Sequence, residues 1–222
     1  MKKCVIFDMD GVIIDSEPIH QKCERKMFQL LGINVSEDEH NAFMGTTDET
    51  WWSWLGSKYD LPIKIPEVIQ LKKKLYMEYL RQEVHIQPIP YVSELISDLH
   101  KNNFLLALAS SSPHEQIDYI LSCFELKKYF HLTISGENVE KGKPSPEIFL
   151  KVSERLQVPP ELCIVIEDSF NGVSAAKSAN MKCIGYMNPN SGNQDLSKAD
   201  ILINSFNGLP VDVIYNLTIS SF

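Results

Sequence analysis

The chain has 222 residues, of which 44% are hydrophobic and 23% are charged. This composition is typical of a globular protein and excludes a disordered one. The 21 Lys and Arg residues against 29 Asp and Glu residues give a formal net charge of −8. Because a net negative field repels phosphodiester backbones and anionic lipid, we expect neither nucleic acid nor a membrane surface as a partner.

The cysteines predict a reducing compartment. They are odd in number, widely spaced and without a CxxC pair: Cys4, Cys23, Cys123, Cys163 and Cys183. This pattern argues against a disulfide framework or a zinc site and favours the cytoplasm. Asp8 and Asp10 interrupt the apolar run after Lys3, which argues against a signal peptide, and no stretch approaches the ~20 apolar residues of a membrane span.

Strand-like and helical patterns alternate along most of the chain. Short apolar runs predict strands at residues 3–7, 104–109, 131–134, 163–166, 182–186 and 199–203. Helical patterns between them cover residues 91–101, 113–124, 146–156 and 170–179. This alternation predicts an α/β fold with a Rossmann-like parallel sheet and helices on both of its faces. Ligands in such folds bind at the carboxyl ends of the strands.

The alternation is broken after the first strand, where only helical patterns occur up to about residue 85 (residues 18–32, 47–58 and 66–82). Pro18 suits the first turn of the first of these helices, and Gly32 suits its end. We therefore predict an all-α domain at residues 16–87, inserted into a core of residues 1–15 and 88–222. Its two adjacent chain crossings are suited to a hinge. Lys72, Lys73 and Lys74 are interpreted as a solvated helix face.

Paired acids follow two of the predicted strands. Asp8 and Asp10 in DMDG alternate along an extended strand end and so lie on the same side, while Gly11 lets the chain turn away. Glu167 and Asp168 follow another strand. Buried like charges are costly unless a cation or a proton offsets them, and carboxylates suit a hard cation such as Mg²⁺. A lone DxD also has ordinary structural explanations.

Two further segments suit phosphate binding. Lys143 lies in KGKPSP, where prolines fix the loop and hold the ammonium, although a lysine in such a loop is usually a surface residue. Ser110, Ser111 and Ser112 follow a strand and precede Pro113 at a helix start. A hydroxyl and free backbone N–H groups there make a phosphate cradle, and Ser112 is interpreted as the helix cap.

The four motifs in this order resemble those of the haloacid dehalogenase superfamily of phosphoryl-transfer enzymes. They are DMDG at residues 8–11, the Ser110 that ends LALAS, Lys143 in GKPSP, and IEDS at residues 166–169. The helical insert resembles the small α-helical cap of that superfamily. Similarity to β-phosphoglucomutase-like members, and within them to hexitol- and deoxyhexose-phosphate phosphatases, lies in the stretches IFDMDGVIIDSEPIH, LALASSSP, KPSPEIF and IEDSFNGVSAA.

The resemblance implies roles for the charged residues. Asp8 would be the nucleophile that forms an aspartyl phosphate, and Asp10 the general acid and then base. Mg²⁺ would be held by the Asp8 carboxylate, the Asp10 backbone carbonyl and Asp168. Glu167 has three open alternatives: binding the metal directly, binding it through water, or orienting Lys143.

The resemblance also implies the groups that bind substrate. Ser110 and Lys143 would hold phosphoryl oxygens, together with Ser111 and the turn at Gly11. The substrate-facing positions of the cap would be Glu17, His20, Gly45 and Thr46, and the alternative for His20 is a polar residue on the face of the helix. Among Trp51, Trp52 and Trp54, some are expected in the cap core, and a sugar stacking on one of them is the alternative.

Two departures from the mutase pattern favour water as the final acceptor. Asp48 stands where mutases place an Arg that grips the second phosphate of the sugar, and Pro113-His114 stands where they carry Lys and Asn. The sequence therefore predicts a Mg²⁺-dependent phosphatase for small phosphomonoesters, sugar or polyol phosphates, acting as a monomer or weak dimer. A phosphomutase is the alternative. A catalytically dead binding module is disfavoured because none of the motif residues is lost.

Overall fold

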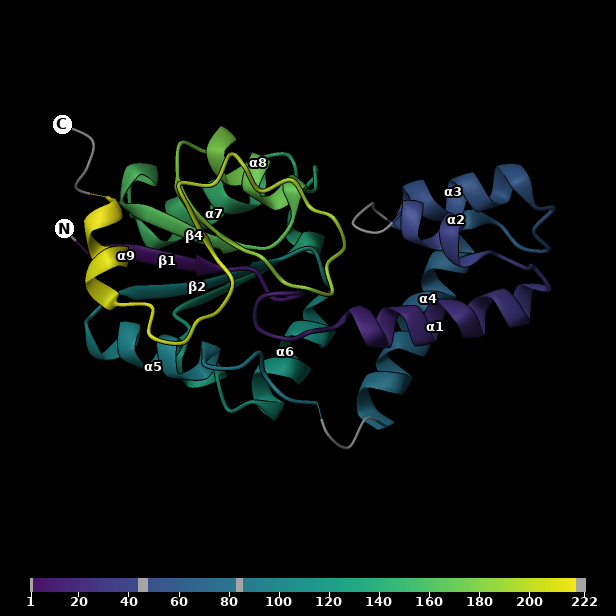
Figure 1. Cartoon of the computed structure of the whole chain (residues 1–222), viewed down its shortest axis with the longest axis horizontal. Coiled ribbons are helices and arrows are strands. Elements are labelled where there is room, and N and C mark those ends of the chain that lie inside the picture. Colours follow the sequence, from purple (N-terminus) through teal and green to yellow (C-terminus); the bar gives the residue numbers. More distant parts are fainter. Residues whose placement is uncertain (1, 44–47, 83–85, 219–222) are drawn as a thin grey trace. The chain divides into compact units, whose positions relative to one another are not determined.

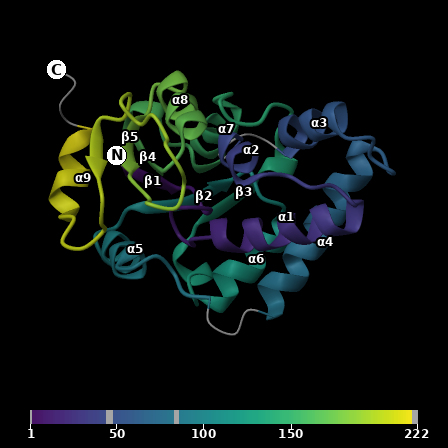
Figure 2. The same ribbon diagram turned by 45° about the vertical axis from the view of Figure 1, so that its right-hand side comes forward.

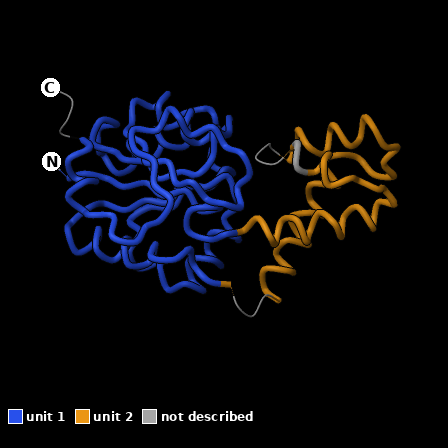
Figure 3. The backbone as a smooth tube through the Cα atoms, in the orientation of Figure 1, with its two compact units in different colours: residues 1–15, 87–222 blue, residues 16–86 orange. Residues whose placement is uncertain are grey.

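The computed structural model describes residues 2–43, 48–82 and 86–218. The chain divides into two compact units, one formed by Met1–Asp15 with Gln87–Phe222 and the other by Ser16–Ile86 (Figure 3). The first unit, unit 1, holds the sheet, and the regular elements of the second, unit 2, are all helices among its described residues. Among the described residues, no helix has both the length and the apolar composition needed to cross a bilayer.

Unit 1 is built on a six-stranded parallel sheet with the order β3-β2-β1-β4-β5-β6. Its strands are β1 (Cys4–Phe7), β2 (Leu105–Ser110), β3 (Leu132–Ser135), β4 (Cys163–Glu167), β5 (Lys182–Tyr186) and β6 (Ile201–Ile203). This is the strand order of Rossmann-like folds, and it places β1 beside both β2 and β4 at the point where the winding reverses. The predicted α/β class is confirmed.

Helices cover both faces of the sheet (Figures 1 and 2). They are α5 (Val92–Lys101), α6 (His114–Cys123), α7 (Glu147–Leu156), α8 (Phe170–Ser178) and α9 (Val211–Leu217), with short 3-10 turns at Lys127–Tyr129, Gly136–Asn138 and Pro160–Leu162. Helices α7 and α8 lie on one face, and α5 and α6 on the other. The helix α9 and the short turns were not predicted.

The strands are apolar runs because both of their faces are covered. All four residues of β1 are fully buried. Cys4 and Ile6 share a core cluster with Ile148 and Phe149 of α7, and the buried Cys163 of β4 belongs to the same cluster. These thiols are free and act as small core residues.

The chain turns sharply after β1. Gly11 has a φ of 77°, and its N–H donates to the Ile14 carbonyl at 2.7 Å. Ile14 pairs with Pro88, and the Ile89 N–H donates to the Ile13 carbonyl at 2.8 Å. The segment that leaves the sheet and the segment that returns to it are therefore hydrogen-bonded side by side within unit 1.

Unit 2 contains α1 (Glu17–Leu31), α2 (Glu37–Ala42), α3 (Asp48–Lys58) and α4 (Ile65–Gln82). As predicted, Pro18 lies in the first turn of α1, and Gly32 ends that helix with a φ of 68°. The short polar helix α2 was not predicted because it has no apolar periodicity. Trp51 and Trp52 are buried in the core of this unit.

The prediction of a solvated lysine face on α4 is wrong for Lys72, which is only 5% exposed. Four residues away on either side, Val68 and Tyr76 are buried as well, so this face of α4 is the inward one. The Lys72 ammonium lies 2.6 Å from Glu24 Oε1 and also pairs with Asp48.

The carboxylate of Glu24 is shared between two partners, Lys72 and His40. Burial alone would raise the pKa of Glu24, but the hydrogen bond from His40 and the charge of Lys72 lower it to about 2. Burial would lower the pKa of Lys72, but Glu24 and Asp48 hold it above its usual value. Helices α1, α2, α3 and α4 therefore each contribute one residue to an ionic cluster around the buried Glu24 and Lys72.

This cluster predicts unequal effects for two neighbouring lysines. Lys72→Met leaves Glu24 buried with one fewer partner and should lower the unfolding free energy of unit 2 by about 3 kcal/mol. Lys73→Met, on the exposed face, should change it by less than about 0.5 kcal/mol. The three tryptophans all lie in unit 2, so tryptophan fluorescence in a urea titration reports on this unit. Equal losses for the two variants would contradict the assignment.

Candidate functional site

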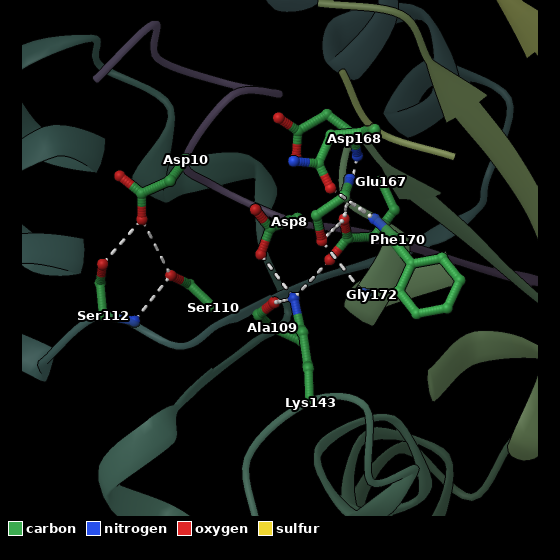
Figure 4. Close-up of polar contacts among 12 residues, drawn as sticks. Asp8, Asp10, Ala109, Ser110, Ser112, Lys143, Glu167, Asp168, Phe170 and Gly172 are labelled. Carbon is green, nitrogen blue, oxygen red and sulfur yellow. Dashed lines mark hydrogen bonds and ion pairs between the residues drawn. The ribbon is translucent and has the colours of Figure 1, made fainter. Parts of the chain in front are cut away.

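Side chains from three adjacent strands meet at the carboxyl edge of the sheet (Figure 4). Asp8 follows β1, Ser110 ends β2, and Glu167 ends β4 with Asp168 directly after it. The parallel register pairs the last residue of β1 with residues near the ends of β2 and β4. The polar residues at the three strand ends therefore lie side by side along one edge of the sheet.

Lys143 connects the three strands. It comes from the loop before α7, and its Nζ donates to Asp8 Oδ1 at 2.6 Å, to Glu167 Oε1 at 2.7 Å and to the Ala109 carbonyl at 3.1 Å. The side chain is only 6% exposed. Burial would lower the pKa of Lys143, but Asp8 and Glu167 raise it above its usual value, so the ammonium stays charged.

Both carboxylate oxygens of Glu167 have hydrogen-bond donors. Oε1 accepts from Lys143, and Oε2 accepts from the Asp168 N–H, the Ser169 N–H and the Ser169 hydroxyl, each at 2.9 Å. The start of α8 packs tightly here, because a Cβ at Gly172 would lie 1.7 Å from Glu167 Oε1. Of the three alternatives for Glu167, this geometry favours orientation of Lys143.

Asp8, Glu167 and Asp168 form a buried acidic cluster. Each offers a carboxylate oxygen, and these oxygens lie within 4.8 Å of one another. Burial, together with Glu167 and Asp10 and against the charge of Lys143, raises the pKa of Asp8 to about 7. Burial, Glu167 and Asp8 raise the pKa of Asp168 well above its usual value. Buried carboxylates that repel one another in this way fit a hard divalent cation, because the cation would offset their repulsion.

Asp10 faces the serines that follow β2. Its Oδ2 accepts from the hydroxyls of Ser110 at 3.4 Å and Ser112 at 2.7 Å. Its Oδ1 is buried and has no hydrogen-bond partner in the part of the chain that the structure describes. The interpretation of Ser112 as the cap of α6 is wrong, because Pro113 occupies the N-cap position and the Ser112 hydroxyl turns to Asp10.

The two predicted backbone contributors to phosphate binding lie at the same edge. Gly11 is buried, and a Cβ there would lie 1.9 Å from Asp168 Oδ2, so the turn after β1 admits no side chain. Ser111 is exposed. Its carbonyl oxygen lies so close to Gly136 that a Cβ on Gly136 would be only 2.6 Å from that oxygen.

The predicted substrate-facing residues belong to unit 2. Glu17 Oε1 accepts from Gln21 Nε2 at 3.3 Å. His20 stacks on Tyr76 with 4.3 Å between ring centroids, and its buried Nδ1 has no hydrogen-bond partner among the described residues. The predicted residues Gly45 and Thr46 lie outside the described residues.

The sequence interpretation missed polar residues that follow β5. The Ser191 hydroxyl donates to Asp168 Oδ2, and Asn188 Nδ2 donates to the Gly11 carbonyl at 2.9 Å. The signal that located the acids also applies to these residues, because their segment follows the carboxyl end of a predicted strand. The asparagines and the glycine of this segment are typical of an ordinary loop, so the composition of the segment gave no sign of a functional role.

Comparisons with known proteins agree with this geometry. A family model described as haloacid dehalogenase-like hydrolase matches residues 5–186. The phosphorylated carbohydrates phosphatase of Thermotoga maritima is 36% identical over 186 residues, which cover 82% of this chain and 83% of that protein. Hexitol phosphatase B of Escherichia coli strain K12 is 28% identical over 215 residues, 92% of each chain.

A solved structure extends the similarity to the whole chain. The crystal structure of β-phosphoglucomutase from Clostridium difficile superposes with a TM-score of 0.82 at 26% identity, covering 99% of this chain and 98% of that one. The match to the family model, the strand order and the arrangement of the four motifs lead to one conclusion: the chain is an enzyme of the haloacid dehalogenase-like hydrolase family.

Proposed function

We propose that this protein is a Mg²⁺-dependent phosphatase that hydrolyses small phosphomonoesters, sugar or polyol phosphates, through an aspartyl phosphate on Asp8. The observation that carries the proposal is the meeting of Asp8 with Lys143, Ser110 and the acidic pair Glu167 and Asp168 at one edge of the sheet. The printed names of the phosphatase relatives support the substrate class.

The phosphoryl group would bind between Asp8 and the loop after β2. Lys143 would contact its oxygens as a fixed positive charge, and the Ser110 hydroxyl and the Ser111 backbone N–H would donate hydrogen bonds. Gly11 would contribute through its turn, because its own N–H donates to the Ile14 carbonyl. Glu167 holds the Lys143 ammonium in place, so that the charge is already oriented before the substrate arrives.

The residues fit Mg²⁺ with the carboxylates of Asp8 and Asp168 and the backbone carbonyl of Asp10 as its ligands. When bound, the ion supplies positive charge that stabilises the transferring phosphoryl group. The charges of the site support this assignment, since the acids outnumber the single lysine and a phosphate adds about two negative charges near neutral pH.

Asp8 and Asp10 divide the chemistry into two steps. In the first, an Asp8 carboxylate oxygen bonds to phosphorus, the bond from phosphorus to the ester oxygen breaks, and Asp10 donates a proton to the leaving alkoxide. In the second, Asp10 takes a proton from water, the water oxygen bonds to phosphorus, and the acyl phosphate bond to Asp8 breaks. Ser110 and Ser112 bind Oδ2 of Asp10, which leaves Oδ1 for the proton transfers.

Unit 2 is assigned the role of a cap, as a domain of residues 16–87 inserted between core segments 1–15 and 88–222. In this role it would exclude water from the site and select the alcohol part of the substrate through Glu17, His20, Gly45 and Thr46. The two segments that flank the insert are paired with each other within unit 1, Ile14 with Pro88.

Hydrolysis is favoured over mutase activity by the surroundings of Asp48. Its carboxylate pairs with the buried Lys72, so this position presents no cation to a second phosphate. Pro113 and His114 likewise stand where the mutases carry a lysine and an asparagine. A phosphomutase remains the second candidate because of the similarity to β-phosphoglucomutase.

Phosphate release should depend on both the metal and the nucleophile. With a panel of sugar and polyol phosphates, we expect release in Mg²⁺ and none after removal of the metal with EDTA. Asp8→Asn should lower the rate by roughly 10⁴-fold or more without changing thermal stability by more than a few degrees. Asp118→Asn, which alters only an exposed ion pair, is the matched control and should be fully active. Near-normal release by Asp8→Asn would overturn the nucleophile assignment.

One incubation separates hydrolase from mutase. β-Glucose 1-phosphate with a catalytic amount of glucose 1,6-bisphosphate should yield free phosphate, because Asp48 stands where mutases place the Arg that grips the second phosphate. Accumulation of glucose 6-phosphate without free phosphate, followed by NMR, would make the phosphomutase the correct assignment.

A further inference from the structure

The loop that follows β5, residues 188–194, reaches three separate parts of the core. The Ser191 hydroxyl donates to the Asp168 carboxylate, and Asn188 Nδ2 donates to the Gly11 carbonyl at 2.9 Å. Asn190 Nδ2 donates to Asp15 Oδ2 at 2.5 Å. This loop therefore joins the acid after β4 to the turn after β1 and to the last residue before the helical insert.

The carboxylate of Asp168 is held from two sides. Its Oδ2 accepts from Ser191 and packs so closely on Gly11 that a Cβ there would lie 1.9 Å away. Since Ser191 binds Oδ2, Oδ1 is the oxygen left without a protein donor among the described residues. The position of this carboxylate is thus fixed by a hydroxyl and by the absence of a side chain at Gly11.

Gln194 keeps Ser191 in place. Its Nε2 donates to the Ser191 carbonyl at 3.0 Å, and its Oε1 accepts from the Phe170 N–H at 3.0 Å. Phe170 is the first residue of α8, only two residues after Asp168. The loop is therefore anchored to the same helix start as the carboxylate that it contacts, so the distance between Ser191 and Asp168 is set by a short chain of hydrogen bonds.

From these contacts we infer that Ser191 is a positioning residue for Asp168 as a metal ligand, and that Asn188 fixes the Gly11 turn against the same carboxylate. The inference rests on the proposed function, in which Asp168 binds Mg²⁺. A carboxylate that must be ordered on metal binding loses rotational freedom, and a hydrogen bond made beforehand removes that cost. Loss of such a partner typically weakens metal binding by 10- to 100-fold.

The test is a calorimetric titration of the whole protein with Mg²⁺ alone. Ser191→Ala should weaken Mg²⁺ binding by about tenfold or more. Ser197→Ala, an exposed serine further along the same segment, should leave it unchanged. Asn188→Ala tests the contact with Gly11 by the same titration, and Asn193→Ala, at an exposed position, is its control. Asn188→Ala also provides the test of the inference if Ser191→Ala does not fold.

Steady-state kinetics distinguish positioning from a general loss of structure. For Ser191→Ala, the Mg²⁺ concentration that gives half-maximal phosphate release should rise by the same factor as the dissociation constant, while kcat at saturating Mg²⁺ stays within about threefold. Unchanged Mg²⁺ affinity in both Ser191→Ala and Asn188→Ala would overturn the inference and leave the proposed function intact. A wild-type protein that neither binds Mg²⁺ nor releases phosphate would overturn the proposed function itself.

Discussion

The site depends on one ammonium group, that of Lys143, placed between the buried carboxylates of Asp8 and Glu167. Buried ion pairs seldom stabilise a fold, because the desolvation of the two charges outweighs much of their attraction. With Asp10 and Asp168 nearby, the carboxyl groups also outnumber the one lysine, and burial and their mutual repulsion raise the pKa of Asp8 and Asp168. The apolar sheet must therefore offset the cost of the cluster. This is the arrangement on which the proposed binding of a cation and a phosphoryl group rests.

The topology explains how residues so distant in sequence can meet. Because β1 lies between β2 and β4, Asp8 has the serines of one neighbouring strand on one side and the acids of the other on its other side. Lys143 and the loop of residues 188–194 then approach from the segments after β3 and β5. The helical unit is inserted after β1, and the pairing of Ile14 with Pro88 joins the two core segments on either side of the insert. The insert therefore does not interrupt the pairing of the strands.

Most of the fold and the charged centre could be predicted from sequence, because each depends on a local pattern. Buried parallel strands are continuous apolar runs, and the residues that follow them are identified by position alone. Three features were not predicted, since tertiary packing establishes each of them. Lys72 resembles its exposed neighbours until the inward face of α4 is known, Ser112 resembles a helix cap, and Ser191 lies in a loop of ordinary turn composition.

The central claim is that Asp8 carries the phosphoryl group between the two steps. It is tested most directly by mixing the enzyme with Mg²⁺ and a substrate from which it releases phosphate, quenching in acid within the first turnover, and analysing the peptides by mass spectrometry. The account predicts one added phosphoryl group on the peptide that contains Asp8, and its disappearance as turnover proceeds to completion. Full phosphate release in the first turnover with that peptide unmodified at every time point, or with the group on another residue, would contradict it.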